Sequence, residues 1–304
     1  MKRCRFSLLA LIAVALPSLA FADTPGFAFL NVPAGARAAG LGGAYATVAE
    51  GVEGAYWNPA GLGFAKGIQL FAGHQEYIQG LRHEQVAVAG RTLGGGYALS
   101  LRAMYTPPID KRDDLGNLVG TFGEQDLDFG LTYGREWVHG VNAGMSLRWL
   151  RERLDNEAVN SFPIDLGVTW DAPALSGLRL GLAAQALGGS PRYTIDGTQG
   201  EPIPLPTSIQ GGASYRFHVS NAWSALGSAE TRFVRGRSGV LLTGLEVTSS
   251  VGGDLRVGWR GNDDATDFSA GAGWRFHAVR IDYAFVPYQS DLGDTHRLSL
   301  LAQF

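Results

Sequence analysis

From Lys66 to the C-terminus, apolar and polar residues alternate with a period of two. Between Asp126 and Trp137, for example, Leu127, Phe129 and Leu131 are separated by Asp and Gly residues. Successive side chains of a β-strand point to opposite faces. The alternation therefore predicts strands that have one apolar and one polar face.

About fourteen such segments of roughly eight to twelve residues follow one another, which is the length that crosses a bilayer at a tilt. We therefore predict an all-β fold, an antiparallel transmembrane β-barrel of about 14 strands. The expected strands lie near residues 66–76, 84–91, 95–107, 125–137, 141–152, 162–172, 178–187, 206–217, 222–233, 238–249, 253–260, 266–276, 279–287 and 294–304.

The connections between these segments alternate between short and long. Short ones such as 138–140 and long ones such as 108–124 and 188–205 should lie at opposite rims. Short periplasmic turns and longer outer loops are typical of outer-membrane barrels. Aromatic residues near both ends of the strands predict belts at the two membrane interfaces. The last strand ends in Phe304, which resembles the C-terminal signal by which such barrels are recognised for assembly.

Residues 1–22 have the three parts of an export signal. Lys2, Arg3 and Arg5 precede an apolar run over 6–19, and Ala20-Phe21-Ala22 fits a cleavage site. The mature chain should then begin at Asp23. The one cysteine, Cys4, lies in this signal, so we expect no disulfide and no cysteine-bound metal in the mature chain.

Residues 23–64 differ from both the signal and the strands, because they are rich in Gly and Ala and show no clean periodicity. We interpret them as a helical and turn plug, or hatch, in the lumen of a barrel formed by residues 65–304. A Gly-rich linker is the alternative, although Trp and Leu are unusual in linkers. The candidate gate is Trp57, Asn58, Pro59, Ala60 and Gly61, where the Asn58 amide either bonds the wall or caps a turn.

The polar faces of the predicted strands carry charges of both signs. A lumen rich in arginine suits anionic head groups, because Arg holds a carboxylate with two hydrogen bonds. The alternative is that these charges pair with one another and with the hatch. The candidate lumen residues are Arg102, Arg148, Arg256, Arg275, Asp282 and Arg297.

The net charge is −3, and it becomes about −6 once the predicted signal is removed. An acidic chain has no general surface for nucleic acid. The six histidines show no metal-ligand spacing, and we expect no metal, no cofactor and no enzyme. A barrel enzyme that uses His74 and His83 with a carboxylate is a remote alternative, and so is a calcium site at 262–267.

The hatch segment resembles that of the FadL long-chain fatty-acid transporter superfamily, and the whole mature chain resembles its PorV/PorQ branch. The motifs that carry the resemblance are 42–45 (GGAY), 57–62 (WNPAGL), 205–206, 213–215, 255–260, 282–285 (DYAF) and 292–300 (LGDTHRLSL). The family implies a fourteen-stranded barrel with an N-terminal plug. It also implies either passage of hydrophobic small molecules or, for PorV-like members, a role in protein secretion and surface attachment.

Two functions therefore remain: a plugged, gated conduit for hydrophobic small molecules, and a scaffold for protein secretion. Either would place the chain in the outer membrane of a Gram-negative-type cell, among its lipids and its barrel-assembly machinery. The partner would be a hydrophobic ligand in the first case and secretion-system proteins in the second. The outer loop 108–124 carries five consecutive charged residues at 110–114, unlike the apolar capture loops of fatty-acid transporters.

Overall fold

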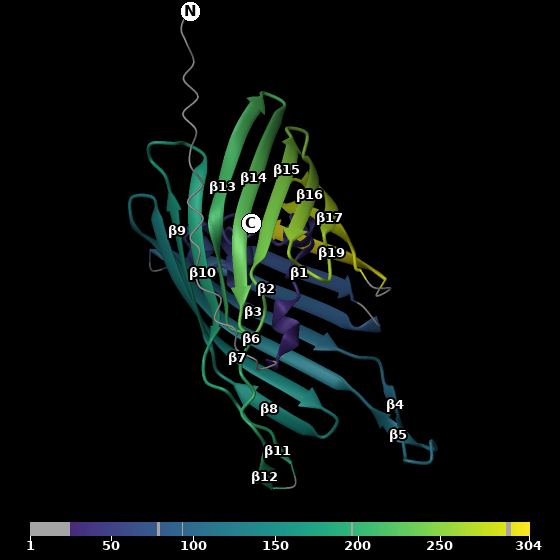
Figure 1. Ribbon diagram of the computed structural model, residues 1–304. Helices are drawn as coiled ribbons and strands as arrows, with labels where there is room; N and C mark the ends of the chain where they lie inside the picture. The colour runs from purple at the N-terminus through teal and green to yellow at the C-terminus, as the bar shows by residue number, and fades with distance from the viewer. Residues whose placement is uncertain (1–24, 78–79, 93, 196, 290–292) are drawn as a thin grey trace, which may run out of the picture.

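A computed structural model describes residues 25–77, 80–92, 94–195, 197–289 and 293–304; the predicted export signal lies outside the described residues. The chain forms a closed antiparallel barrel of 14 strands around a short N-terminal helical segment. Figure 1 shows the tilted strands wrapped around this segment. No helix among the described residues is long and apolar enough to cross a membrane.

The strands of the wall lie close to the predicted segments. They are β1 (Gln69–Glu76), β2 (Arg82–Thr92), β3 (Gly95–Tyr105), β6 (Glu124–Val138), β7 (Val141–Leu154), β9 (Ile164–Asp171), β10 (Leu178–Leu187), β13 (Ser208–Ser220), β14 (Trp223–Val234), β15 (Val240–Ser249), β16 (Gly253–Gly261), β17 (Phe268–Phe276), β18 (Val279–Pro287) and β19 (Asp294–Gln303).

Each wall strand pairs with its neighbour in the sequence, and β1 pairs with β19 to close the barrel. Ile68 and Phe304 exchange two backbone hydrogen bonds at this seam, so both ends of the wall meet at one rim. The connections at that rim are mostly short, such as 139–140, 221–222 and 277–278. The longest connections, 106–123 and 188–207, lie at the other rim, as the sequence predicted.

The long-loop rim carries additional short strands. The ribbon β4 (Ile109–Arg112) and β5 (Leu118–Phe122) projects beyond the wall, and so do β8 (Glu157–Ser161), β11 (Thr194–Ile195) and β12 (Thr198–Gln199). β8 pairs with the end of β7, and β9 continues that pairing after Pro163. On the other side of β9, β10 has a register shift at Ala186, which has a positive φ.

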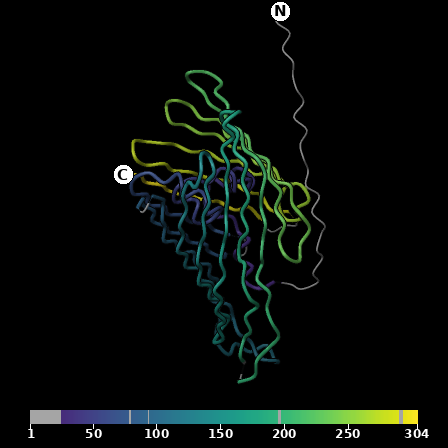
Figure 2. Tube along the Cα trace, turned by 90° about the vertical axis from the view of Figure 1, so that its left-hand side faces the viewer, coloured from purple at the N-terminus to yellow at the C-terminus, as the bar shows by residue number. Residues whose placement is uncertain are grey.

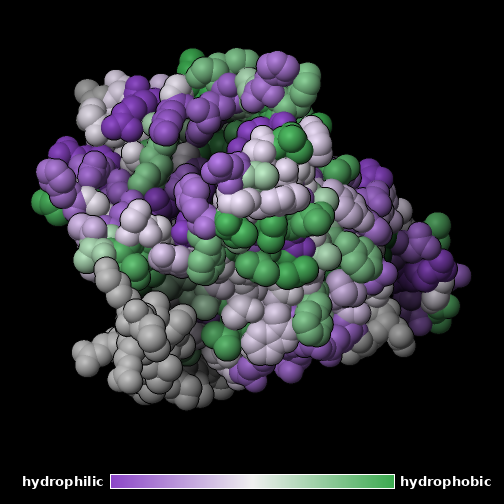
Figure 3. All heavy atoms as spheres, turned by 90° about the horizontal axis from the view of Figure 1, so that it is seen from above, coloured by the Kyte–Doolittle hydropathy of each residue, from purple (hydrophilic) through white to green (hydrophobic). Residues whose placement is uncertain are grey.

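The outward face of the wall is apolar. Leu99, Leu131, Leu182 and Leu245 are among the many large apolar side chains that stay exposed there. Aromatic residues, including Trp137, Trp223 and Trp274, lie exposed near the short-turn ends of their strands. Seen from above, apolar side chains group across the middle of the view between more hydrophilic regions (Figure 3). An apolar band with aromatic residues at its edge suits a lipid bilayer.

The N-terminal segment lies inside the barrel (Figure 2). It consists of η1 (Ala28–Asn31), α1 (Ala36–Gly40), η2 (Gly51–Glu53), α2 (Gly54–Trp57) and η3 (Pro59–Phe64), linked by turns. Nearly all of its residues from 32 to 62 are buried. These elements are too short to be stable alone, so the wall must supply most of their stability. We call residues 26–64 the hatch.

Candidate functional site

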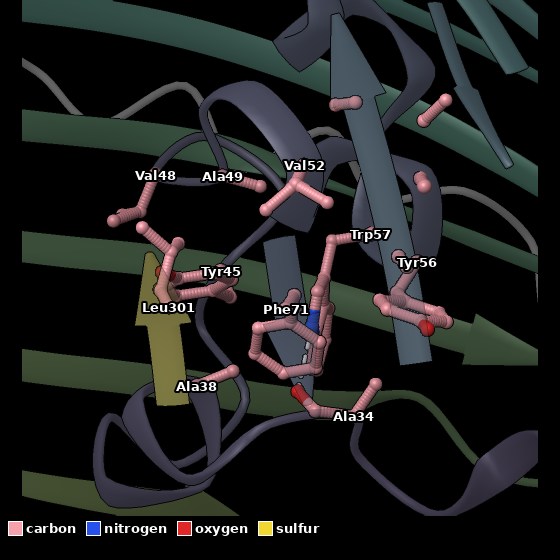
Figure 4. Packing of buried hydrophobic residues seen from close by; sticks show 14 of the residues in the cluster. Ala34, Ala38, Tyr45, Val48, Ala49, Val52, Tyr56, Trp57, Phe71 and Leu301 are labelled. Atoms are coloured by element: carbon pink, nitrogen blue, oxygen red, sulfur yellow. Dashed lines mark hydrogen bonds between the residues drawn. The ribbon is translucent and has the colours of Figure 1, made fainter. Parts of the chain in front are cut away.

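The hatch has its own apolar core, which also fixes it to the wall. Tyr45 and Trp57 meet edge to face with ring centroids 5.6 Å apart. Tyr56 packs against Phe71 of β1 at 5.7 Å. Figure 4 shows these rings together with Leu301 of β19, between small residues of the hatch. The indole N–H of Trp57 donates to the carbonyl of Ala34 at 3.0 Å, so its one polar atom is satisfied.

Asn58 is fully buried where α2 ends and η3 begins. Its Oδ1 accepts a hydrogen bond from the backbone N–H of Ala60 at 3.1 Å. Its Nδ2 donates to the carbonyl of Ala46 at 2.9 Å and to that of Val168, on β9, at 3.4 Å. Asn58 therefore caps a turn and contacts the wall at the same time. The cap and the contact inside the hatch are the stronger interactions, since the bond to Val168 is long.

The wall beneath η3 is made of glycine. Gly96, Gly134, Gly144 and Gly167 lie opposite one another in register on β3, β6, β7 and β9. A Cβ added at any of the first three would overlap the backbone of residues 59–62, and one at Gly167 would overlap the Asn58 side chain. The row lets the hatch backbone lie directly on the sheet.

A second glycine patch receives the end of α1. Gly244 and Gly258 pair in register on β15 and β16, and a Cβ on either would collide with the backbone of Leu41. Glu230 of β14 holds the following turn. Its carboxylate accepts hydrogen bonds from the backbone N–H groups of Ala46 and Thr47 at 3.0 and 2.8 Å.

Ion pairs attach the hatch to the β15–β18 side of the wall. The guanidinium of Arg37 binds both oxygens of Glu246, at 2.6 and 2.7 Å. Glu53 accepts from Arg280 at 2.8 Å. Arg256, fully buried, joins Glu246, Asp254 and Asp282. Three arginines and four carboxylates thus form one buried network between hatch and wall, where each charge has a partner.

A further ion pair fixes the hatch at the short-turn rim. Arg179 of β10 binds Glu50 at 2.8 Å and Asp171 at 2.6 Å. Burial raises the pKa of Glu50, but the charge of Arg179 outweighs it and holds that pKa below its usual value. Glu50 is therefore ionised at neutral pH.

A second charged cluster belongs to the wall alone. Arg102, Asp128, Arg148 and Asp165 lie on the adjacent strands β3, β6, β7 and β9, with Arg102 2.7 Å from Asp128. Tyr56 of the hatch packs its ring 5.6 Å from the Arg102 guanidinium. These charges pair across neighbouring strands, which stiffens the wall behind the hatch.

A cavity of about 720 Å³ opens above the hatch at the long-loop rim. We call it the vestibule. Its floor is the hatch, and its sides come from β3, β6 and the connection after β1 on one side and from β13–β16 on the other. Five aromatic rings line it, from Phe29, Trp57, Tyr77, Tyr105 and Tyr288. Val32, Met104, Leu242 and Arg232 also line it. Its size and mixed lining suit a small organic ligand.

The vestibule is closed at its base by hatch residues 31–33, which we call the strap. A second cavity of about 20 Å³ lies beneath the strap, beside Arg102 and Arg148. Asn31, Val32, Pro33, Trp57 and Arg232 line both cavities. The lower cavity holds about one water molecule. The strap therefore separates the vestibule from this lower cavity.

The predicted site residues fall into three groups. The predicted gate (Trp57, Asn58, Pro59, Ala60 and Gly61) is buried between the core of the hatch and the glycine row. Arg102, Arg148, Arg256 and Asp282 lie in the charged clusters. Arg297 is buried under the strap.

Arg275 does not lie with the other predicted lumen residues. It is exposed near the end of β17, one residue before Phe276 and close to the short-turn rim, although its partner across the strands, Arg280, reaches the hatch. The alternation of apolar and polar residues placed Arg275 on the inward face of its strand, but it could not show how far along the barrel axis the residue lies.

The sequence did not single out Arg232, Glu230 or Glu246. Their signal was only a charged residue on the inward face of a strand, which many other positions share. His74 and His83 do not form one site. His74 lies on the outer surface, 2.8 Å from Glu84, and His83 is buried on the inner surface. Among the described residues there is no cluster of three or more metal-ligating side chains.

No protein-family model matches the sequence, and no curated protein matches it. The fold is similar to solved barrels. The toluene transporter TbuX of Ralstonia pickettii superposes with a TM-score of 0.60 at 14% identity, over 89% of this chain and 98% of that one. The Pseudomonas putida toluene transporter TodX superposes with a TM-score of 0.60 at 12% identity, over 92% of this chain and 97% of that one. A Pseudomonas aeruginosa FadL homologue superposes with a TM-score of 0.53 at 11% identity, over 89% of this chain and 98% of that one. At these identities the likeness shows a shared fold.

Proposed function

We propose that this protein is an outer-membrane conduit for hydrophobic small molecules, closed by its hatch. The vestibule carries the proposal: it is a cavity of about 720 Å³, lined by five aromatic rings, at the rim with the long loops. A hydrophobic compound enters there from outside, leaves water and rests on the hatch. Barrels with this fold are described as toluene transporters, which supports the same assignment.

The fixed and movable parts of the hatch suggest how passage occurs. Ion pairs and glycine contacts hold residues 37–62 against the wall. Among the described residues, the strap has two hydrogen bonds to the wall, Arg232 to Asn31 and Arg297 to Pro33, at 3.2 and 3.3 Å. Passage therefore requires movement of the strap rather than loss of the whole hatch. No step in this proposal is catalytic.

Uptake in cells tests the conduit. A strain that lacks the gene is supplied with the wild type or with one variant, and the accumulation of radiolabelled ethylbenzene is compared between these strains. Leu242→Trp fills the vestibule from its inner wall, while Leu241→Trp, one residue away, places the same ring on the lipid face. The wild type and Leu241→Trp should restore uptake, and Leu242→Trp should leave it several-fold lower. Equal uptake by both variants would contradict the proposed route.

A PorV-like role in secretion is the second candidate, favoured by the ribbon β4–β5. Leu115, Leu118 and Val119 of this ribbon are exposed by 87%, 59% and 58%, well beyond the wall. Exposed apolar residues on a projecting loop suit contact with another protein. In the same deletion strain, loss of proteins from the cell surface with unchanged ethylbenzene uptake would favour this role over the conduit.

A further inference from the structure

Two inward-facing arginines near the vestibule lack a counter-charge. The buried arginines of the two charged clusters and Arg37 of the hatch each have a carboxylate within 2.8 Å. Among the described residues, Arg232 and Arg297 have none within 4.0 Å, and each bonds only neutral oxygens: Asn31 Oδ1 for Arg232, and Pro33 O and Tyr288 Oη for Arg297. A poorly solvated guanidinium without a carboxylate favours an anion from elsewhere.

Arg232 is the one of the two that lines the vestibule. Its Nε and the Nδ2 of Asn31 are buried N–H donors without an acceptor among the described residues. The nearby Asp263 is already paired with Arg260 at 3.3 Å. The other vestibule carboxylates are Asp264, which forms no ion pair with Arg232 within 4.0 Å, and Glu124 and Asp126 on β6, five strands from β14 around the barrel. The guanidinium of Arg232 therefore has no carboxylate within 4.0 Å among the described residues.

Five aromatic rings also line the vestibule. Trp57 and Phe29 lie at its base, and Tyr77 and Tyr288 meet edge to face above, with ring centroids 5.5 Å apart. A flat ring packs well against such side chains. The cavity of about 20 Å³ beneath the strap is too small to take the tail of a long-chain compound.

We propose that the vestibule selects aromatic carboxylates, with the carboxylate on Arg232 and the ring among the aromatic residues. This inference rests on the proposed conduit and names its substrate class. It also gives the ligand an effect on the strap. The same guanidinium holds Asn31 by one neutral hydrogen bond, and a carboxylate is the stronger acceptor. Binding therefore draws Arg232 away from Asn31 and loosens the strap.

Calorimetry on the purified full-length mature protein tests the substrate class, with 4-ethylbenzoate and 4-ethylbenzyl alcohol as probes at fixed salt. The two share a ring and differ in charge. The wild type should bind the acid about tenfold or more tightly than the alcohol. Arg232→Gln should abolish that preference and Arg232→Lys should keep part of it. Arg192→Gln, on an exposed loop outside the vestibule, should bind both probes as the wild type does.

The outcomes separate this inference from the conduit itself. Binding of neither probe would overturn both proposals. Equal binding of both, unchanged by Arg232→Gln, would overturn the anion site and leave the conduit intact. Octanoate binding as tightly as 4-ethylbenzoate would overturn the preference for an aromatic ring, and acetate binding as tightly would reduce the site to a simple anion site.

A cysteine in the strap tests the loosening directly. The predicted mature chain contains no cysteine, so Val32→Cys introduces a single buried thiol. Its reaction with a maleimide should be several-fold faster with saturating 4-ethylbenzoate than with saturating alcohol. In Val32→Cys/Arg232→Gln the rate should not respond to the acid. A rate that is unchanged by 4-ethylbenzoate in the single variant would overturn the coupling to the strap.

Discussion

Single buried polar groups carry much of the attachment of the hatch, because a polar atom without a partner is costly once water is excluded. Asn58 illustrates this, since it makes three hydrogen bonds while being fully buried. The backbone groups that it bonds at Ala46 and Ala60 are buried too, so water cannot take the place of the Asn58 side chain.

Replacing Asn58 by Ala should weaken the docking of the hatch by about 1–3 kcal/mol, because the carbonyl of Ala46 and the N–H of Ala60 lose their partner. Amide hydrogen exchange in 40–62 should become faster, while exchange in the wall strands stays slow. Asn262→Ala, at the long-loop rim, is the matched control. Unchanged exchange in the hatch would mean that Asn58 does not hold it.

Arg256 has a larger effect because three carboxylates depend on it. Arg256→Met leaves Asp254 without a cation within 4.0 Å among the described residues and removes one partner each from Glu246 and Asp282. The loss of stability should be about 3–5 kcal/mol, measured by denaturant unfolding in micelles. The exposed Arg275→Met should change stability by less than about 0.5 kcal/mol. Similar losses for both would show that the buried network is not tightly coupled.

At the scale of elements, hatch and wall meet through bare backbone. The glycine row beneath η3 crosses four neighbouring strands, so close approach there is a property of the sheet rather than of one residue. Contacts of this kind leave no room for even a methyl group.

Gly144→Ala should therefore displace η3, because the new Cβ overlaps the backbone of Pro59. The barrel should still insert, but its ion conductance in planar bilayers should rise well above that of the wild type. Gly227→Ala on β14 adds the same methyl group at a position where the nearest contact, Phe217, is at 3.6 Å, and should conduct like the wild type. Wild-type conductance in Gly144→Ala would mean that the contact is not tight.

Removing the whole hatch, residues 26–64, should leave a wall that conducts ions steadily, since a bore of fourteen strands is too wide for its own side chains to fill. Replacing β4–β5 (109–122) by a short Gly-Ser turn removes a projecting ribbon and should leave conductance unchanged. A low conductance in the hatch deletion would show that other segments block the lumen.

At the scale of the whole molecule, the two rims have different lengths of loop, which predicts that the long-loop rim faces the outside of the cell. Lys111 and Arg112 are exposed on β4 at the long-loop rim. Trypsin added to intact cells should cut there, and Lys111→Gln/Arg112→Gln should remove that cut. Arg275, at the short-turn rim, should be cut only after the outer membrane is opened. Cutting at Arg275 on intact cells would reverse the orientation.

The sequence predicts the wall well and the site only in part. The alternation in Asp126–Trp137 is a local property, and the observed strand β6 lies close to it. Which arginine meets which carboxylate depends on register between strands and on the path of the hatch, which no local pattern contains. The glycine row shows the same limit, since each glycine is visible alone but their alignment is not. The vestibule brings together residues from 28 to 288, so only the fold reveals it.

The seam between residues 68 and 304 has a consequence for biogenesis. The wall closes only when β19 and Phe304 pair with the start of the first strand, so the barrel stays open until residues 294–304 have been made. The hatch is made before the wall, yet the wall glycines on which it packs come from strands between β3 and β16. Contacts so distant in sequence form slowly. The chain must therefore be kept from aggregating until residues 68 and 304 meet, and a chain that ends before β19 would contain the whole hatch segment and an open wall.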